Sequence, residues 1–534
     1  MRPLTPTPAI NIAARLLERA ARHPERAAFV SWRGSRAERV TFEQLARRVA
    51  RFSARLRARG VTSGDRVLLF VPMSVELYVA LLAILHAGAT AVFMDAWADR
   101  RRLEAAVDAA RPRAFVGTLR AHLLRLVSPA VRAIPVSFLV RHGLGGRLRK
   151  PWVSEPESIP SAAPIPPSMA ALVTFTTGST GRPKAAARSH QFLWAQHQIL
   201  AAHLGQRESD VDMPTLPVFV LNNLAGGITS VLPDFDPRRP AEIRPAVILE
   251  QIRAASVTTA SGSPAFFERL CEHVLTTDGT LPLQAFFTGG APVPPELART
   301  FARCCAGAQV LYGSTEAEPI AALPAQELVQ RTEAGGGIGL CAGTPIPEIE
   351  LTIVRPTDGP IVLGAGGWSA WRQGGGEPGE IVVTGPHVLA GYLDNPEADR
   401  ENKVRDGDRV WHRTGDGGFL DDQGRLWLTG RVKHRVQRAG ETWWGLPVEL
   451  RALSVPAIAH AAYLGLPDPR LGQRAVLCVE IPPAAMGPAT ESELVAAAAP
   501  APVDQVIALE RIPRDPRHAS KTDMEALIAR IQRA

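Results

Sequence analysis

The sequence predicts an α/β fold in which helices alternate with buried strands over most of the chain. Leu45, Val49, Phe52 and Leu56 recur at i, i+4, i+7 and i+11, the stripe of an amphipathic helix. The apolar run Val67–Val71 follows a turn and predicts a short strand. Repeated helix–strand units of this kind are typical of parallel or mixed β-sheets that helices cover on both faces.

Further elements are expected downstream. The most apolar window, Val75–Met94, contains Glu76 and His86, so we interpret it as a buried helix, a glycine turn and a strand rather than a membrane span. Short β segments replace the alternating pattern after Gly379, and the residues after Gly430 form a small α+β region. The helix is expected at Leu77–His86 and the strands at Ala91–Met94, Ala254–Ala260, Ala285–Thr288 and Gln309–Tyr312.

Length and composition indicate a multidomain globular protein. A chain of 534 residues exceeds one hydrophobic core, so two or more domains are expected. Its 46% hydrophobic and 21% charged residues are ordinary for such a protein. The first residues do not combine a basic start with a long apolar run, so no signal peptide is predicted. Five cysteines show neither metal-ligand spacing nor a disulfide framework, and a reducing cytoplasm is the expected location.

The net charge of +8 is unevenly distributed. Residues 109–154 contain no Asp or Glu, and leucines and valines lie among their basic residues at near-helical spacing. This pattern is typical of an arginine-rich solvated face, and a basic surface for peripheral contact with a membrane or an acidic partner is the alternative. Nucleic acid is not expected, because aromatic residues are few and no nucleic-acid motif is present. The basic residues are Arg111, Arg113, Arg120, Arg125, Arg132, Arg141, Arg147, Arg149 and Lys150.

A hydroxyl- and glycine-rich stretch, Thr174–Lys184, carries the clearest chemistry. Hydroxyl donors and approachable glycine N–H groups beside one lysine are suited to binding phosphate. The spacing is not that of a P-loop, because Arg-Pro separates the second glycine from the lysine and alanine follows. Taken alone, the stretch also fits a polar surface loop. The candidate phosphate ligands are Thr176, Thr177, Gly178, Ser179, Thr180, Gly181 and Lys184.

Four further motifs follow the loop, namely Tyr312–Glu316, Thr414–Asp416, Gly430–Arg431 and Lys521. In order and separation the five together resemble the adenylate-forming superfamily of acyl-CoA synthetases, nonribosomal-peptide adenylation domains and luciferases. The resemblance implies an N-terminal AMP-binding adenylation domain at residues 1–430 and a mobile C-terminal domain at residues 431–534. Lys433 falls at the implied hinge.

The resemblance also implies roles for these residues around ATP. The loop would bind the β- and γ-phosphates and orient pyrophosphate as the leaving group. Thr315 would contact the α-phosphate, and Glu316 would hold Mg²⁺, a hard cation that prefers carboxylate oxygen. Asp416 would accept hydrogen bonds from the ribose hydroxyls, and Arg431 would reach the ribose or a phosphate. The adenine slot is expected among Gly289, Gly290, Ala291, Tyr312 and Gly313.

Lys521 resembles the C-terminal lysine that bridges the substrate carboxylate and the α-phosphate during adenylation. A lone lysine near a chain end is usually solvated, so this interpretation depends on the other motifs. The chemistry requires a carboxylate to attack the α-phosphorus of ATP, and the two anions repel until cations screen them. A lipid carboxylate is the expected small-molecule substrate.

Several segments resemble one subgroup more closely, the β-lactone synthetases of bacterial long-chain olefin biosynthesis. That likeness implies adenylation of a long-chain 2-alkyl-3-hydroxy acid, whose own 3-hydroxyl then displaces AMP. Val220 stands where acyl-CoA synthetases commonly place a histidine, and a valine can neither donate a hydrogen bond nor carry a proton. A long-chain acyl-CoA ligase that uses CoA is the alternative, and a non-catalytic nucleotide-binding protein is the third hypothesis. The segments are 211–217, 229–237, 262–265, 289–295 and 515–518.

Some residues stay outside this assignment. His190 and His434 are candidate bases for ring closure, although each is more commonly structural. His434 replaces an acidic residue after the hinge, and the Trp443–Trp444 pair departs from the superfamily pattern. Other enzymes of the same pathway are candidate partners, and no transmembrane segment is expected.

Overall fold

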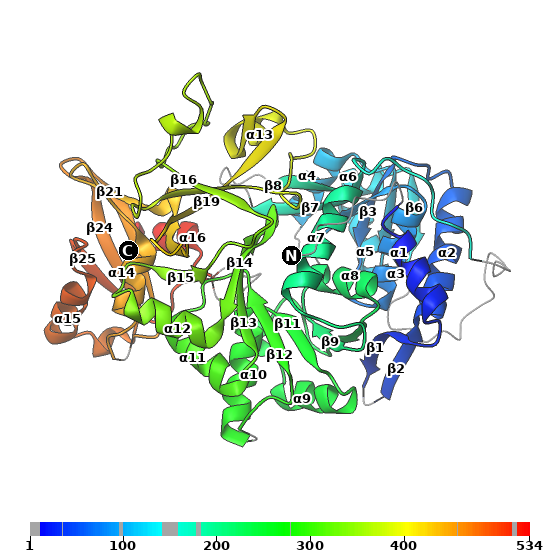
Figure 1. Ribbon diagram of the computed structural model, residues 1–534, viewed down its shortest axis with the longest axis horizontal. Helices are drawn as coiled ribbons and strands as arrows, with labels where there is room; N and C mark the ends of the chain where they lie inside the picture. Colours follow the sequence, from blue (N-terminus) through cyan, green and yellow to red (C-terminus); the bar gives the residue numbers. More distant parts are fainter. Residues whose placement is uncertain are drawn as a thin grey trace.

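The computed structural model describes residues 11–34, 36–94, 100–140, 159–177, 183–277, 279–456, 458–514 and 521–533. It confirms the α/β prediction, with a large N-terminal part of helix-covered sheets and a small α+β part at the C-terminal end (Figure 1). None of the helices in the described ranges is long and apolar enough to cross a membrane.

The first sheet is six-stranded and carries the phosphate-loop stretch at its edge. Its order is β6-β5-β3-β4-β7-β8, and only β8 runs antiparallel to its neighbour. Such a buried parallel sheet explains the continuous apolar runs of its strands. The strands are β3 (Arg66–Phe70), β4 (Thr90–Phe93), β5 (Ala114–Gly117), β6 (Val136–Leu139), β7 (Ala170–Thr177) and β8 (Pro183–Ser189).

The second sheet has eight strands in the order β14-β13-β12-β11-β9-β10-β1-β2. Its six central strands are parallel, and one antiparallel strand closes each edge. The strands are β1 (Ala27–Arg33), β2 (Arg36–Thr41), β9 (Val211–Pro214), β10 (Thr229–Leu232), β11 (Thr259–Gly262), β12 (Ala285–Gly289), β13 (Ala308–Ser314) and β14 (Ala317–Pro324).

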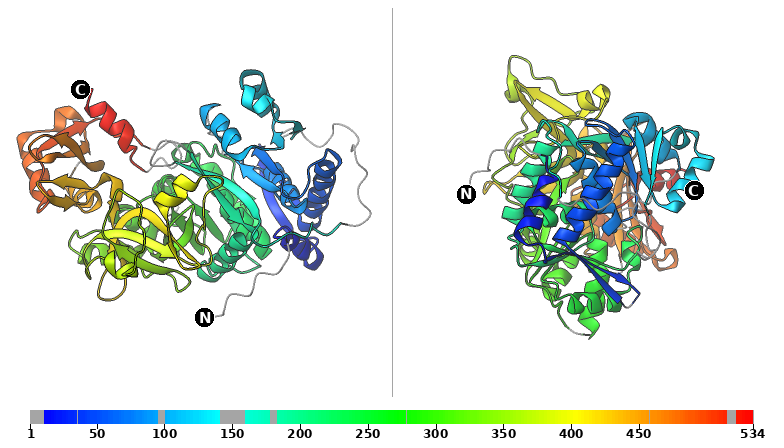
Figure 2. Two further views of the ribbon diagram at one scale, coloured as in Figure 1. Left: turned by 90° about the horizontal axis from the view of Figure 1, so that it is seen from above. Right: turned by 90° about the vertical axis from the view of Figure 1, so that its right-hand side faces the viewer.

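The third sheet is antiparallel, as the change of pattern after Gly379 indicates. A three-stranded sheet, β23-β24-β25, and a two-stranded ribbon follow in the C-terminal part, which lies at one end of the molecule (Figure 2). The strands are β15 (Leu340–Gly343), β16 (Glu350–Val354), β17 (Gly379–Thr384), β18 (Lys403–Asp406), β19 (Arg409–Leu420), β20 (Leu426–Arg431), β21 (Val436–Arg438), β22 (Glu441–Trp443), β23 (His460–Asp468), β24 (Gly472–Glu480) and β25 (Gln505–Leu509).

Helices cover the two parallel sheets and flank the C-terminal sheet (Figure 1). They are α1 (Ala14–Arg22), α2 (Phe42–Ala58), α3 (Val75–His86), α4 (Arg100–Ala110), α5 (Leu119–Val127), α6 (Pro129–Arg132), α7 (His190–His203), α8 (Pro217–Gly226), α9 (Pro245–Ala254), α10 (Pro264–Thr277), α11 (Pro295–Cys304), α12 (Ala325–Ala334), α13 (Pro396–Asn402), α14 (Gly445–Ala452), α15 (Pro488–Ala498) and α16 (Met524–Ile531). Short 3₁₀ turns lie at Pro240–Glu242, Gly367–Ala370, Val432–His434 and Pro483–Ala485.

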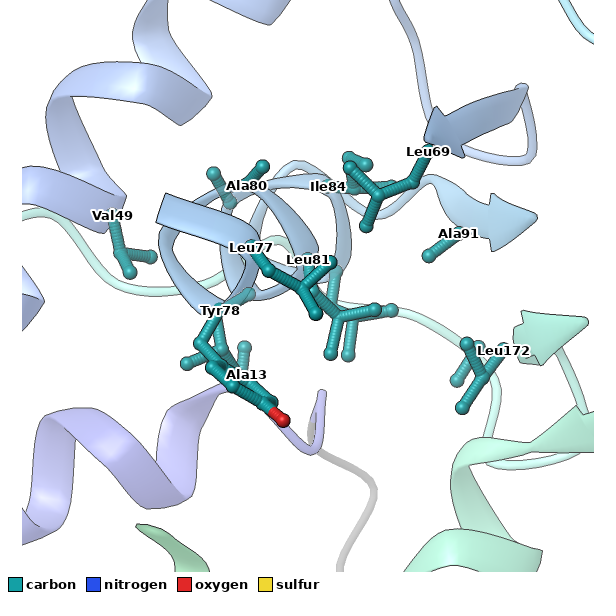
Figure 3. Packing of buried hydrophobic residues seen from close by; sticks show 14 of the residues in the cluster. Ala13, Val49, Leu69, Leu77, Tyr78, Ala80, Leu81, Ile84, Ala91 and Leu172 are labelled. Atoms are coloured by element: carbon teal, nitrogen blue, oxygen red, sulfur yellow. The ribbon is translucent and has the colours of Figure 1, made fainter. Parts of the chain in front are cut away.

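The apolar window at residues 75–94 folds as the sequence predicts. Ser74 caps α3 by accepting a hydrogen bond from the Leu77 N–H at 3.2 Å. Figure 3 shows α3 surrounded by α2, by strands of the first sheet and by the chain before α1. Tyr78 and Leu81 are almost fully buried there, so the helix is apolar on every face because every face is covered.

One strand begins later than predicted. α9 continues to Ala254, and Ser256 adopts a positive φ of 52° in the turn that follows. The strand then runs over Thr259–Gly262 instead of Ala254–Ala260. The β-branched run around Val257 predicts a strand by composition, but the helix must extend to Ala254 before the chain can turn back into the sheet.

His190, at the start of α7, gives the fold an acid-sensitive position. Its Nδ1 accepts a hydrogen bond from the Ile12 N–H at 3.1 Å, and burial lowers the pKa of the imidazole from 6.5 to about 4. The unfolded chain therefore takes up a proton below about pH 6.5, whereas the folded chain does so only below about pH 4. The neutral His190 therefore makes its full contribution to the free energy of unfolding only above the pKa of the unfolded chain. We expect about 2 kcal/mol of that contribution to be lost between about pH 7.5 and about pH 5.

His190→Gln keeps an acceptor for the Ile12 N–H and removes the titration. Chemical denaturation at about pH 7.5 and about pH 5 measures the free energy of unfolding. We expect the difference between the two pH values to be smaller in this variant than in the parent by about 2 kcal/mol. An unchanged pH dependence would show that His190 does not contribute to acid sensitivity.

Candidate active site

A cleft with a volume of about 1910 Å³ lies where four parts of the molecule meet: the first sheet, the second sheet, the antiparallel third sheet and the C-terminal part. The ends of β12 and β13 open into it. Because these strands are parallel neighbours, their carboxyl ends deliver the segments after Gly289 and Ser314 to one edge of the sheet. The predicted site residues that line this cleft are Lys184, Gly289, Gly290, Ala291, Tyr312, Gly313, Thr315, Glu316, Asp416, Arg431, Lys433 and Lys521.

The glycines after β12 allow a close backbone approach. A Cβ on Gly289 would lie 2.5 Å from the Leu311 carbonyl oxygen, and Gly290 has a φ of 86°. Both positions therefore require glycine for geometric reasons. The backbone at Gly289 therefore lies close to the backbone just before Tyr312.

Asp416 is the centre of a polar network across the cleft wall. Tyr312 Oη donates to its Oδ2 at 2.9 Å, and Arg431 Nη1 donates to its Oδ1 at 2.7 Å. Burial and the neighbouring Asp416 raise the pKa of Tyr312, so the phenol stays neutral and donates. The Asp416 charge likewise raises the pKa of Arg431. Each carboxylate oxygen keeps a further lone pair, which leaves capacity for two hydroxyl donors.

Glu316 lies in a buried cluster of opposite charge. Tyr392 Oη donates to its Oε1 at 2.9 Å, and the Nζ atoms of Lys184 and Lys403 lie 5.8 and 5.2 Å from the Tyr392 ring centre. Burial alone would raise the pKa of Glu316, but the Lys403 ammonium and the Tyr392 hydrogen bond lower it. Glu316 is therefore ionised at neutral pH.

Lys403 compensates this charge from the buried side. It is 6% exposed, and its Nζ donates to the Leu389 carbonyl oxygen. Burial lowers its pKa to about 7, while Glu316 acts against that shift. His412 is also buried, and burial together with Lys403 lowers its pKa to about 3, so it is a neutral imidazole. Its Nδ1 lies 3.2 Å from the Asn402 carbonyl oxygen.

Sequence reasoning missed Lys403, His412 and Tyr392. A usable signal was the scarcity of lysine, since the chain has five lysines against 55 arginines. Three of the five line the cleft, and Lys403 adjoins it through Tyr392. Four of the five lysines in this arginine-rich chain therefore lie in the cleft or beside it.

The phosphate-loop stretch is partly strand. β7 continues to Thr177 and β8 begins at Pro183, so Lys184 belongs to a strand and pairs with Thr176 in register. Its Nζ lies 3.9 Å from Glu401 Oε2, and burial lowers its pKa. Gly178, Ser179, Thr180 and Gly181, and the side chains of Thr176 and Thr177, lie outside the described residues, so their contact with phosphate stays a prediction.

A hydrogen bond joins β8 to the Tyr312–Glu316 segment. Arg188 Nη2 donates to the Thr315 carbonyl oxygen at 2.9 Å, and Arg188 is buried. The backbone of Thr315 is thus fixed relative to Lys184 on the same strand.

The C-terminal part closes the other side of the cleft. Lys433 lies in a 3₁₀ turn after β20, and its Nζ is 3.2 Å from Glu525 Oε1 on α16. Lys521 lines the cleft before α16; residues 515–520, which precede it, lie outside the described ranges. Burial lowers the pKa of His434 to about 4, and Lys433, Arg431 and Lys521 add to that shift. His434 therefore faces the cleft as a neutral imidazole, while His190 packs near Ile12 outside the cleft lining.

The two tryptophans of the unusual pair face different ways. Trp443 packs against the C-terminal core, whereas Trp444 covers Gly417, the residue after Asp416. A Cβ on Gly417 would lie 1.9 Å from the Trp444 ring. Trp444 therefore presses the C-terminal part against the strand that carries Asp416.

Gly417→Ala should destabilise this contact by overpacking, at a cost of about 1–3 kcal/mol in unfolding free energy. The loss should shrink when Trp444→Ala is already present, because the clash has then been removed. Denaturant unfolding of both single variants and the double variant measures this coupling. Gly359→Ala is the control, since nothing lies within 4 Å of its Cβ position. Equal losses with and without Trp444 would refute the contact.

Val220 does not line the cleft. It is fully buried in the core that α1 and α3 share, whereas Val218, Phe219 and Leu221 of the same helix line the cleft. The helical turn of α8 places these neighbours on different faces. The absence of histidine at this position therefore does not by itself decide what happens to an adenylate.

The inner wall of the cleft is apolar. Side chains from α3, β4, β7 and α8 contribute to it, and they adjoin Lys184 and Arg188. An apolar wall beside a cationic region suits a substrate with a hydrocarbon chain and an anionic head. The apolar residues are Leu77, Leu81, Phe93, Met94, Leu172, Val218 and Leu221.

The donor set is compatible with Mg²⁺. Within the described ranges, no group of three or more His, Cys, Asp or Glu side chains is placed to hold a metal ion by itself. Mg²⁺ needs less than that, because it commonly binds one or two carboxylates together with substrate phosphates and water. The ionised Glu316 at the cleft fits this requirement.

Comparisons with known proteins identify the family of the chain. The profile described as AMP-binding enzyme matches residues 16–393. An olefin beta-lactone synthetase of Stenotrophomonas maltophilia is 36% identical, with 88% of each chain covered. One from Xanthomonas campestris pv. campestris is 32% identical and covers 91% of this chain and 90% of its own. A feruloyl-CoA synthase of an Amycolatopsis species is 29% identical, with 81% and 82% covered.

A solved structure shares the fold. The ATP-bound structure of MatB from Rhodopseudomonas palustris superposes with a TM-score of 0.80 at 21% identity, covering 98% of this chain and 99% of the other. Fold, cleft and family match define an adenylate-forming ligase that uses ATP. The chain belongs to the AMP-binding enzyme family.

Proposed function

We propose that this enzyme adenylates a long-chain 2-alkyl-3-hydroxy acid and closes it to a β-lactone, with release of pyrophosphate and then AMP. The observation that carries the proposal is the likeness, over about nine-tenths of both chains, to two proteins named olefin beta-lactone synthetase. The apolar wall beside Lys184 supports a hydrocarbon substrate. We place the reaction in the cytoplasm, where the five buried cysteines would stay as free thiols.

In the first half-reaction, a carboxylate oxygen attacks the α-phosphorus and pyrophosphate leaves. Lys184 and Lys521 screen the charge on the two anions from opposite sides of the cleft. Thr315 contacts the α-phosphate, and the Asp416–Arg431 pair holds the ribose hydroxyls. Mg²⁺, bound through Glu316, would neutralise phosphate charge.

In the second half-reaction, the 3-hydroxyl oxygen attacks the acyl carbon, the bond to AMP breaks and the hydroxyl proton is released. The nucleophile is already tethered to its electrophile, and tethering in the right geometry supplies roughly 7–11 kcal/mol of the barrier. The enzyme must hold the bent conformer and exclude water from the adenylate. The apolar wall serves both needs.

We also propose that residues 1–430 and 431–534 are separate domains with a hinge at Lys433. The C-terminal part has its own apolar clusters, and the exposed pair between Lys433 and Glu525 can break without large cost. Rotation of the C-terminal domain about this hinge after adenylation would move Lys521 out of the cleft and bring another face of that domain to it.

A long-chain acyl-CoA ligase is the second candidate. The likeness to a feruloyl-CoA synthase favours it, although at lower identity and coverage. In that case CoA would take the place of the 3-hydroxyl as nucleophile.

Incubation with ATP, Mg²⁺ and a synthetic 2-alkyl-3-hydroxy acid, with and without CoA, tests the proposal. We expect AMP release without CoA and a product lighter than the acid by one water. The matched substrate lacks only the 3-hydroxyl and should stop at the adenylate. Ready formation of a thioester from simple fatty acids, with no dehydrated product from the hydroxy acid, would establish the ligase instead.

A further inference from the structure

Helix α5 carries an apolar stripe on its solvent side. Leu119, Leu123 and Leu126 are 66%, 56% and 73% exposed, and Val127 is 55% exposed. They occur at i, i+4, i+7 and i+8, so they share one side of the helix. Globular helices normally place polar residues on that side.

The opposite side of α5 is already packed. Ala121 and Leu124 join a core cluster with Leu103 of α4 and Val131 of α6. Thr118 caps the helix by accepting a hydrogen bond from the Ala121 N–H at 3.3 Å. The exposed stripe is therefore a second apolar side, which is not needed to hold α5 in place.

This concentration is unusual within the molecule. Eight large hydrophobic side chains are exposed in the described part of the chain, and five of them are the α5 stripe and Leu139. The other three, Ile338, Val362 and Val495, are far apart in the sequence. Single exposed apolar residues are ordinary, but a contiguous group marks an interaction surface.

Most of the charge around the stripe is positive, with one exposed carboxylate, Asp108, on α4. Arg120 lies on α5 beside Val127, and Arg111, Arg113 and Arg132 on the adjoining segments are exposed. On α4, Glu104 is paired with Arg100 at 2.9 Å. Four further basic residues of the same acid-free segment, Arg141, Arg147, Arg149 and Lys150, lie outside the described residues.

The segment also projects toward solvent near the cleft. Figure 2 shows the part from α4 to α6, in cyan, standing out from the body of the molecule in both views. α4 packs in the same cluster as α5, and its Arg101, Arg102 and Ala105 line the cleft. A surface that binds α5 would therefore lie beside the cleft.

We propose that the exposed side of α5, with the arginines around it, docks on the surface of an anionic lipid bilayer. Leucine side chains would enter the boundary between headgroups and acyl chains, and the arginines would face negative headgroups. An apolar stripe beside a cluster of exposed arginines complements a surface with an apolar interior and a negative exterior. The contact is peripheral and does not depend on which product the enzyme makes.

Vesicle co-sedimentation tests the proposal with the full chain. The probes are vesicles of phosphatidylcholine alone and of phosphatidylcholine with phosphatidylglycerol in equal parts. We expect binding to the anionic vesicles to exceed binding to phosphatidylcholine alone by about five-fold for each basic residue engaged, and to weaken with added salt. Leu123→Ser with Leu126→Ser should reduce binding by about ten-fold or more, because two apolar side chains no longer enter the bilayer.

The matched control is Val362→Ser, which alters an equally exposed apolar residue elsewhere and should bind as the parent does. Thermal unfolding and AMP release with a short soluble acid should be unchanged in all three proteins, which excludes misfolding. The proposal is overturned if the parent does not bind anionic vesicles, or if the double variant binds as well as the parent. Self-association that requires the stripe, without vesicle binding, would show a protein–protein contact instead.

Discussion

Lys521→Ala is expected to lower the rate of adenylate formation by about 10²-fold or more, by analogy with the loss of one preorganised charge-stabilising donor. Lys521 lines the same cleft as Lys184, from the C-terminal side. Without it, the carboxylate and the α-phosphate would approach each other with less screening of their charges. Pyrophosphate release with saturating substrates measures this step.

Lys433→Ala is the matched control, because it removes another lysine of the cleft. Its pair with Glu525 is solvent-exposed, so we expect a change of less than about five-fold in adenylation. Lys521→Ala should still convert a synthetic acyl adenylate, which separates a lost first step from misfolding. Near-normal pyrophosphate release from Lys521→Ala would overturn its assignment.

Glu316→Gln is expected to lower adenylation on the order of 10²-fold and to raise the Mg²⁺ concentration that the reaction needs. The amide keeps an acceptor for Tyr392 but loses the charge that Lys403 and Lys184 face in the buried cluster. The rate as a function of Mg²⁺ concentration measures both effects.

Glu401→Gln is the control for that variant. Glu401 also lies near Lys184, at 3.9 Å, but its side chain is 40% exposed and solvent screens the pair. We expect less than about a five-fold change and no shift in Mg²⁺ dependence. Equal effects of the two substitutions would mean that Glu316 has no special relation to the metal.

The local sequence pattern predicted the helices and strands whose buried positions recur at a regular spacing. The stripe through Leu45 and Leu56 became α2, and the apolar window became α3 and β4, because periodicity reports directly which faces a neighbour covers. The strand at Ala254–Ala260 was wrong because its start depends on where α9 meets the sheet. The resemblance identified Val220 as the residue at the usual histidine position, and only the structure showed that the turn of α8 places it in the core.

By itself the sequence determined the α/β class and the set of polar motifs that share this cleft. The motif residues follow one another along the chain in a characteristic order and separation, so their chemistry can be identified before their positions are known. Only the tertiary structure decided which groups compensate Glu316, because Tyr392 and Lys403 reach it from segments about 76 and 87 residues away. Burial and charge at that distance in sequence depend on how sheets pack, and no local pattern encodes the packing.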